Sequence, residues 1–256
     1  MKRIVACAAA LTLLACGGGD DASSNEAAQE GAASAQSSGP QGNATVTGTI
    51  SFTGTAPANP PIDMSAEAAC KSKHSGAITD PQVVVKDGKV ADVIVYVKSG
   101  LPANATYAAP AQTVELDQEG CLYKPRALAV MAGQSIDIKN SDPVLHNIKA
   151  VPKTNRGFNI SQPTAGMVSK RKFDRPEQVI PLECNVHSWM HANVAVLPHP
   201  FFAVTSDNGT FEIKGLPPGT YEIEAWHEKL GTRTMTVTVG DGESKTADFN
   251  FAASRA

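Results

Sequence analysis

Short runs in which apolar and polar residues alternate cover most of the chain, and this pattern predicts β-strands rather than helices. In Thr45–Gly54, apolar side chains and a glycine fall on one side and hydroxyl side chains on the other. Val93–Val97 is continuously apolar, which predicts a strand buried on both faces. Further strands are predicted at Thr113–Asp117, Ser135–Lys139, Gln178–Leu182, Ala192–Leu197, Phe202–Val204, Thr210–Ile213, Tyr221–Trp226, Thr234–Val239 and Lys245–Phe251.

Interruptions of this pattern are few. Ser65–Lys73 is the one stretch with a helical pattern, and Asn159–Arg175 is polar enough to predict a long connection. The predicted fold class is all-β, built from β-sandwiches. Two segments without this strand pattern precede the sandwiches.

Two such segments open the chain. Residues 1–15 combine Lys2 and Arg3 with an apolar run and indicate a signal peptide, because the run is too short to span a membrane as a helix. Its end, Leu13-Leu14-Ala15-Cys16, resembles the lipobox of bacterial lipoproteins, which implies that Cys16 carries lipid; an ordinary cleaved signal peptide is the alternative. Residues 16–44 have no large apolar side chain, so we expect a disordered linker.

Charge and cysteine content narrow the possible partners. The formal net charge of −3 gives no basic surface for nucleic acid, so none is expected. Besides Cys7 and Cys16, the chain has Cys70, Cys121 and Cys184, an odd number for an oxidising compartment. The economical arrangement is a disulfide between Cys70 and Cys121 with Cys184 left as a thiolate held by a metal, although Cys184 could instead pair with either or be a buried core thiol.

Glu183–His191 holds a thiol, two imidazoles and a thioether in the turn between two predicted strands. Cys184, His187 and Met190 are spaced as Cys-x-x-His-x-x-Met, and sulfur with imidazole is a donor set suited to copper. Glu183 and His191 lie next to these residues and are possible alternative ligands, although strand alternation predicts that both point away from a metal held by Cys184.

A cupredoxin resemblance appears upstream of this stretch. Tyr123–Val130 reads aromatic-x-Pro-x-x-Leu-x-Val, and it is followed by a glycine turn, an alternating strand, Asn-x-Asp and His146-Asn147. This order resembles the cupredoxins, and the short ligand spacing resembles amicyanin more than plastocyanin. The resemblance implies one type 1 copper ion held by His146, Cys184, His187 and Met190.

It also implies roles for two neighbours. Asn147 would tie the two ligand-bearing segments together. Trp189 is either a plug against the rest of the protein or an apolar rim where a redox partner docks near an exposed edge of His187. His74 is expected to be solvated, and His199, Trp226 and His227 are expected to be structural.

A second resemblance lies downstream. Thr-x-x-x-Gly-x-Phe-x-Ile-x-x-Leu-Pro-Pro-Gly-x-Tyr, ending at Tyr221, resembles the carboxypeptidase regulatory-like domain, a transthyretin-like sandwich grouped with carbohydrate-binding-like folds. That family begins with strands like Val46–Ile50 and Val93–Val97. We therefore expect a discontinuous sandwich, 45–108 and 200–254, with a cupredoxin-like domain inserted as 109–199; two tandem domains are the alternative.

These features together favour a lipid-anchored electron carrier. We expect it in the cell envelope, at the outer membrane facing the periplasm or at the cell surface, with an unidentified redox protein as partner. A copper store without a partner, or a glycan-binding adhesion module, are the alternatives. An enzyme is not expected, because the axial ligand leaves no open position for substrate.

Overall fold

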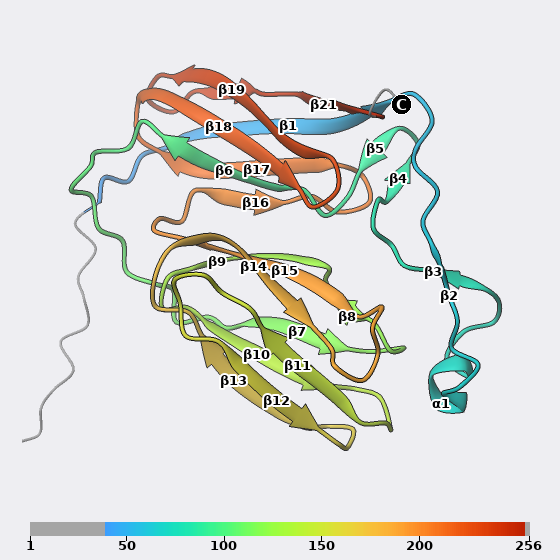
Figure 1. Cartoon of the computed structure of the whole chain (residues 1–256). Helices are drawn as coiled ribbons and strands as arrows, with labels where there is room; N and C mark the ends of the chain where they lie inside the picture. The colour runs from blue at the N-terminus through green and yellow to red at the C-terminus, as the bar shows by residue number, and fades with distance from the viewer. Residues whose placement is uncertain (1–38, 254–256) are drawn as a thin grey trace, which may run out of the picture. The chain divides into compact units, whose positions relative to one another are not determined.

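The computed structural model describes residues 39–253, and almost all regular structure there is β (Figure 1). The expected signal peptide, Cys16 and most of the expected linker lie outside the described residues. Among the described residues, no helix is long and apolar enough to cross a membrane.

One sandwich is built from strands of both chain halves. Its first sheet has the order β17-β1-β5-β4, with β20 and β21 also paired to β1, and its second has the order β16-β6-β18-β19. The first sheet comprises β1 (Ala44–Thr53), β4 (Val85–Lys86), β5 (Lys89–Val90), β17 (Thr210–Leu216), β20 (Ser244–Thr246) and β21 (Phe249–Ala252). The second comprises β6 (Ile94–Ser99), β16 (Phe202–Val204), β18 (Gly219–His227) and β19 (Gly231–Val239).

The intervening chain forms another pair of sheets. Their orders are β13-β10-β7-β8 and β12-β11-β14-β15-β9. The first comprises β7 (Val114–Gln118), β8 (Tyr123–Lys124), β10 (Ser135–Asn140) and β13 (Val168–Lys172). The second comprises β9 (Ala127–Met131), β11 (His146–Ala150), β12 (Phe158–Gln162), β14 (Glu177–Glu183) and β15 (His191–Leu197).

Each sheet pair encloses its own apolar core. Ile50, Phe251 and Ile223 belong to the core of the first pair, and Leu116, Ile148 and Leu182 to that of the second. A smaller cluster of Ile94, Tyr96, Ala127, Ala195 and Leu197 joins β6 to β9 and β15. The continuous apolar run of β6 is therefore explained, since its alternate side chains enter two different cores.

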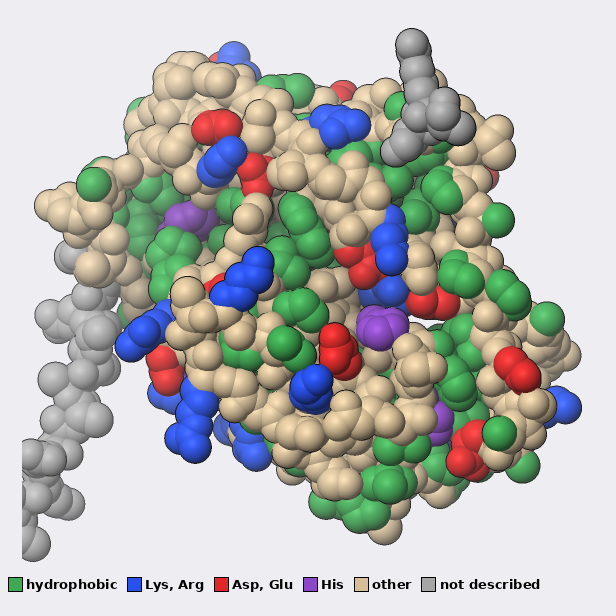
Figure 2. Space-filling view, in the orientation of Figure 1, with side chains coloured by type: hydrophobic (Ala, Val, Ile, Leu, Met, Phe, Trp, Pro, Cys, Tyr) green, Lys and Arg blue, Asp and Glu red, His purple; other side chains and the backbone are tan. Residues whose placement is uncertain are grey.

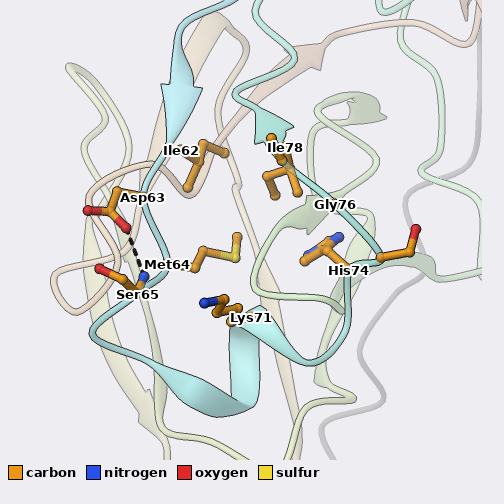
Figure 3. Close-up of a pocket in the computed structure, with 10 residues that line it drawn as sticks. Ile62, Asp63, Met64, Ser65, Lys71, His74, Gly76 and Ile78 are labelled. Atoms are coloured by element: carbon orange, nitrogen blue, oxygen red, sulfur yellow. Dashed lines mark hydrogen bonds between the residues drawn. The ribbon is translucent and has the colours of Figure 1, made fainter.

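A segment that links β1 to β4 has little regular structure. It contains the two-stranded ribbon of β2 (Pro61–Ile62) and β3 (Ile78–Thr79) and the helix α1 (Ala68–Lys71). We call residues 61–79 the cap segment. Figure 3 shows a pocket between its ribbon and α1, where Met64 and His74 extend from opposite sides toward the space between them.

Two expectations about local structure were wrong. Asn159–Arg175 is not an irregular connection, because it contains most of β12 and all of β13, which pair with β11 and β10 in different sheets. The helical stretch is also shorter than expected, since α1 has only four residues. Polar side chains are tolerated in β13 because it lies at the edge of its sheet with alternate residues exposed.

Candidate metal centre

The four predicted ligands lie at strand ends of one sheet. His146 begins β11, Cys184 follows β14, and His187 and Met190 lie in the turn that leads into β15. Antiparallel pairing of β14 with β15 brings the two ends of this turn together, and β11 pairs with β14. The turn is closed by backbone hydrogen bonds from Met190 N to His187 O (3.0 Å) and from Cys184 N to Met190 O (3.2 Å).

Three of the ligands converge in the structure. The Nδ1 atoms of His146 and His187 are 3.1 Å apart, and Cys184 Sγ is 3.9 Å from His187 Nδ1. One donor atom from each of the three residues lies within 4.8 Å of the others. All three residues are buried, and Met190 is fully buried in the same core.

Cys184 is surrounded by donors. Burial raises the pKa of its thiol, but hydrogen bonds from the imidazoles of His146 and His187 and from the amides of His187 and Asn147 outweigh this effect, so the pKa falls to about 5. The His187 amide lies 3.4 Å from the sulfur. Cys184 is therefore a thiolate at neutral pH, which is the form that binds metals.

Asp142 contacts the His146 ring on the side opposite the cluster. Asp142 Oδ2 accepts a hydrogen bond from His146 Nε2 at 2.9 Å, and Asp142 is only 1% exposed. The two oxygens of Asp142 also accept hydrogen bonds from the amides of Gly120 (2.9 Å) and Cys121 (2.7 Å). Burial raises the pKa of Asp142, yet these hydrogen bonds bring it down to about 2.

The hydrogen bond to Asp142 determines that Nε2 of His146 carries a proton. Burial lowers the pKa of its imidazole, while Asp142 and Cys184 raise it by more. A proton on Nε2, held by Asp142, turns Nδ1 toward the cluster, where its lone pair becomes available to a metal ion. Carboxylate–histidine–metal arrangements of this kind are common in metalloproteins. The sequence reasoning missed Asp142, although the Asn-x-Asp signal four residues before His146 contained it.

The disulfide covers His187. Cys70 and Cys121 are joined in the structure, and Cys184 is the free cysteine among the described residues. Cys70 Sγ lies 3.6 Å from His187 Nε2, and His187 is only 3% exposed. The expected exposed edge of His187 is thus wrong, because the cap segment occupies the space where solvent would reach the ring.

Trp189 packs against the same disulfide. Its Nε1 donates a hydrogen bond to Cys121 O at 2.9 Å, and its ring lies 5.2 Å from the His187 ring. Trp189 is partly buried against the core that contains Cys184, rather than against the other sandwich. It therefore links the ligand turn to the Cys121 loop.

Asn147 joins the two ligand-bearing segments. Its Oδ1 accepts a hydrogen bond from the amide of Asn185 at 3.2 Å, and its Nδ2 donates to Ile160 O at 3.0 Å. Its backbone oxygen accepts from the hydroxyl of Tyr123 at 2.5 Å. Burial, Cys184 and Glu183 raise the pKa of Tyr123, so this hydroxyl stays protonated and keeps donating.

Glu183 and His191 lie apart from the cluster. The two residues face each other across β14 and β15, and Glu183 forms an ion pair with Lys149 at 3.4 Å with 42% of its side chain exposed. His191 lines a surface pocket with Arg126 and Asn193. Neither belongs to any group of metal-ligating atoms found among residues 39–253.

The remaining histidines have structural contacts. His199 Nε2 donates to Val97 O at 2.8 Å, and His227 Nδ1 accepts from the amide of Lys229 at 3.1 Å. His74 is not simply solvated as expected, since its Nε2 donates to Gly120 O at 2.8 Å and ties the cap segment to the Cys121 loop.

The donor set fits one small metal ion. Metal–nitrogen bonds of about 2.0 Å and metal–sulfur bonds of about 2.3 Å place ligand atoms roughly 3–4 Å apart around a shared ion. The distances of 3.1 Å and 3.9 Å at this site fall in that range. A thiolate with two imidazoles in a trigonal arrangement and a nearby thioether is the donor set of blue-copper sites.

Comparisons with known proteins give one family match and several similar solved structures. Residues 189–252 match the model of the carboxypeptidase regulatory-like domain. No curated protein matches the chain. Among solved structures, the chain is similar to a novel purple cupredoxin from Nitrosopumilus maritimus, with 21% identity, 33% of this chain and 99% of that chain covered, and a TM-score of 0.29.

Two further solved structures are similar. For amicyanin from Paracoccus versutus the identity is 21%, with 40% of this chain and 97% of that chain covered and a TM-score of 0.30. For the Cu-containing nitrite reductase from Thermus scotoductus SA-01 the identity is 16% and the TM-score 0.32; the match covers 39% of this chain but only 25% of the reductase. Residues 189–252 are thus similar to the carboxypeptidase regulatory-like domain, and the solved structures similar to this chain include cupredoxins.

Proposed function

We propose that this protein binds one copper ion through His146 Nδ1, Cys184 Sγ and His187 Nδ1, with the thioether of Met190 as a weak axial ligand. The observation that carries the proposal is the convergence of one donor atom from each of the first three residues within 4.8 Å in a buried site. Cys184 is held as a thiolate beside two imidazoles, and the thiolate is the form of cysteine that binds metals.

The role that this site supports is the transfer of single electrons. Copper in such a site alternates between Cu(I) and Cu(II), and the protein supplies a fixed set of ligands on strand ends of one sheet. The Asn147–Asn185 contact and the closed turn keep these ligands in place in both oxidation states. No position is left open for a substrate if Met190 coordinates, so we propose a carrier rather than an enzyme.

The partner of this carrier would be a redox protein that docks on an apolar rim. Leu145 and Val186 are among the few large apolar side chains that are exposed in the described residues, at 42% and 47%. Each immediately precedes one of the histidine ligands. We further propose that Cys16 anchors the chain by lipid to the cell envelope, with the site facing the periplasm or the exterior.

Acidic and basic side chains lie next to one another over much of the face in Figure 2. Ion pairs among the described residues include Lys98 with Glu224 and Lys170 with Asp137. A surface of mixed charge and net charge −3 supports neither a nucleic acid nor an anionic membrane surface as partner.

The experiment is copper titration of the purified protein followed by visible and paramagnetic resonance spectroscopy. We expect an intense thiolate-to-copper band at one ion per chain that disappears in Cys184→Ser and His187→Asn. The matched control is His191→Asn, which alters an imidazole close in sequence but outside the cluster and should keep the band. Absence of bound copper in the wild type would refute the proposal, and irreversible voltammetry would favour a copper store over a carrier.

A further inference from the structure

In both histidine ligands, Nε2 is the ring nitrogen that points away from the cluster. In His187 it contacts Cys70 Sγ directly, and in His146 it is linked to the Cys121 amide through Asp142. We propose that this disulfide and Asp142 form a clamp that positions both histidine ligands, so that opening the disulfide or removing the carboxylate frees the rings and weakens metal retention. This inference rests on the proposed function only for its last step, because the positioning of the rings is a property of the metal-free chain.

The connection to His187 is direct. Cys70 Sγ is 3.6 Å from His187 Nε2, a distance at which an N–H group can donate a weak hydrogen bond to sulfur. When Nδ1 faces the cluster without a proton, Nε2 must carry one, and the disulfide sulfur is its partner in the structure. Contact with the disulfide therefore selects both the orientation of the ring and the tautomer that exposes Nδ1 to the metal.

The connection to His146 passes through Asp142. The Cys121 amide and His146 Nε2 both donate to Asp142 Oδ2, at 2.7 Å and 2.9 Å, while the Gly120 amide donates to Oδ1 at 2.9 Å. Asp142 thus holds the Cys121 loop and the ligand ring at once. An asparagine has one acceptor oxygen in place of two, so Asp142→Asn cannot keep all three hydrogen bonds.

The loop that carries Cys121 needs support from outside. Gly120 and Cys121 both have positive φ, at +66° and +56°, and the left-handed conformation is uncommon for cysteine. The loop is held by Asp142, the disulfide, the hydrogen bond from Trp189 Nε1 to Cys121 O and the hydrogen bond from His74 Nε2 to Gly120 O. Because Trp189 lies between His187 and Met190, the loop also restrains the ligand turn itself.

The Nε2 protons of the two rings in the metal-free, full-length protein test the clamp without copper. In wild-type protein with ¹⁵N-labelled histidine, we expect long-range nitrogen–proton spectra to show a proton on Nε2 of both His146 and His187 that exchanges slowly with solvent. In Asp142→Asn, the Nε2 proton of His146 should exchange about tenfold faster. Asp137→Asn is the matched control, because Asp137 lies in the same domain and pairs with Lys170 on the surface.

Reducing the disulfide tests its proposed contact with His187. A phosphine reductant and water convert the disulfide to two thiols and the phosphine to its oxide. In the reduced, metal-free wild type we expect the Nε2 proton of His187 to exchange about tenfold faster. Unchanged exchange at His187 after complete reduction, or an unchanged His146 spectrum in Asp142→Asn, would overturn the clamp.

Copper retention completes the test. In competition with a Cu(I) chelator, Asp142→Asn should bind copper about 10- to 100-fold more weakly than the wild type and the Asp137→Asn control, a usual effect of losing a partner of a ligating histidine. Equal affinity would refute the clamp while leaving the copper proposal intact. If no variant or wild type binds copper, the proposed function fails and the nuclear magnetic resonance arms still decide the clamp.

Discussion

The thiol of Cys184 should titrate far below an ordinary cysteine in the metal-free protein. The change to impose is acidification of the protein from neutral pH, with Cys184→Ser as the reference. The imidazoles of His146 and His187 and two backbone amides surround the sulfur, and the pKa of about 5 is well below the usual value of 9.0. Lowering the pKa means that the thiolate is present above pH 5 and is lost as the pH falls through it.

The free energy by which the site stabilises the Cys184 thiolate follows from the shift of its pKa. Each pKa unit corresponds to about 1.4 kcal/mol, so the site stabilises the thiolate over the thiol by about 5 kcal/mol. His146 takes up part of this charge difference, since its own pKa is raised by Asp142 and Cys184 against the lowering effect of burial. The Cys184 thiolate and the His146 imidazole therefore titrate as a coupled pair, and the observable to follow is the thiolate itself.

The assay is the ultraviolet absorbance of the thiolate, recorded against pH as the difference between wild-type protein and Cys184→Ser. This difference cancels the tyrosines and the other cysteines. We expect a midpoint near pH 5 in the wild type. A midpoint near 8 or above would show that the imidazoles do not stabilise the sulfur and would refute the reasoning from the site geometry.

Two further predictions concern stability. Arg126 is buried between Asp80 and Glu228, so Arg126→Ala leaves the buried carboxylate of Asp80 and the partly buried carboxylate of Glu228 without their ion pairs; in urea denaturation it should lower the free energy of unfolding by about 3 kcal/mol or more. The control Lys86→Ala, which removes an exposed ion pair, should cost less than about 1 kcal/mol. His227 is 1% exposed and burial lowers its pKa from 6.5 to about 4, so stability should fall by up to about 3 kcal/mol as pH drops from 6.5 to 4, and His227→Asn should remove this dependence.

Local sequence signals predicted the donor set because the ligands occupy strand ends. Cys184, His187 and Met190 share one short turn, and alternation along β14 and β15 separated them from Glu183 and His191. Sheet strands with alternating or continuous apolar runs were predictable from these runs, whereas β12 and β13 are polar edge strands with weak patterns.

The surroundings of the ligands could not be predicted in this way, because they depend on contacts between distant segments. Asp142 meets the Gly120 and Cys121 amides only after the Cys121 loop folds over β11. Similarly, the burial of His187 depends on Cys70, which lies in the cap segment far upstream in the chain. The alternation of apolar and polar residues along each strand contains no information on these contacts between distant segments.

The carboxylate also sets the charge of the proposed copper site. Cys184 and Asp142 each contribute one negative charge, while metal-bound histidines are neutral. Cu(II) neutralises these two charges, whereas Cu(I) leaves one negative charge in a buried site. Lys73 offsets little of it, because its ammonium lies 3.8 Å from Asp142 and its side chain is 41% exposed.

Removing the charge of Asp142 should therefore favour Cu(I). At an effective dielectric constant of about 20, a nearby unit charge changes the balance by about 2 kcal/mol, which is roughly 90 mV for a one-electron couple. Voltammetry of Asp142→Asn should give a potential higher than that of the wild type by this order, and Asp137→Asn should leave it unchanged. A lower potential in Asp142→Asn would mean that loss of ring positioning outweighs loss of charge and would contradict this electrostatic account.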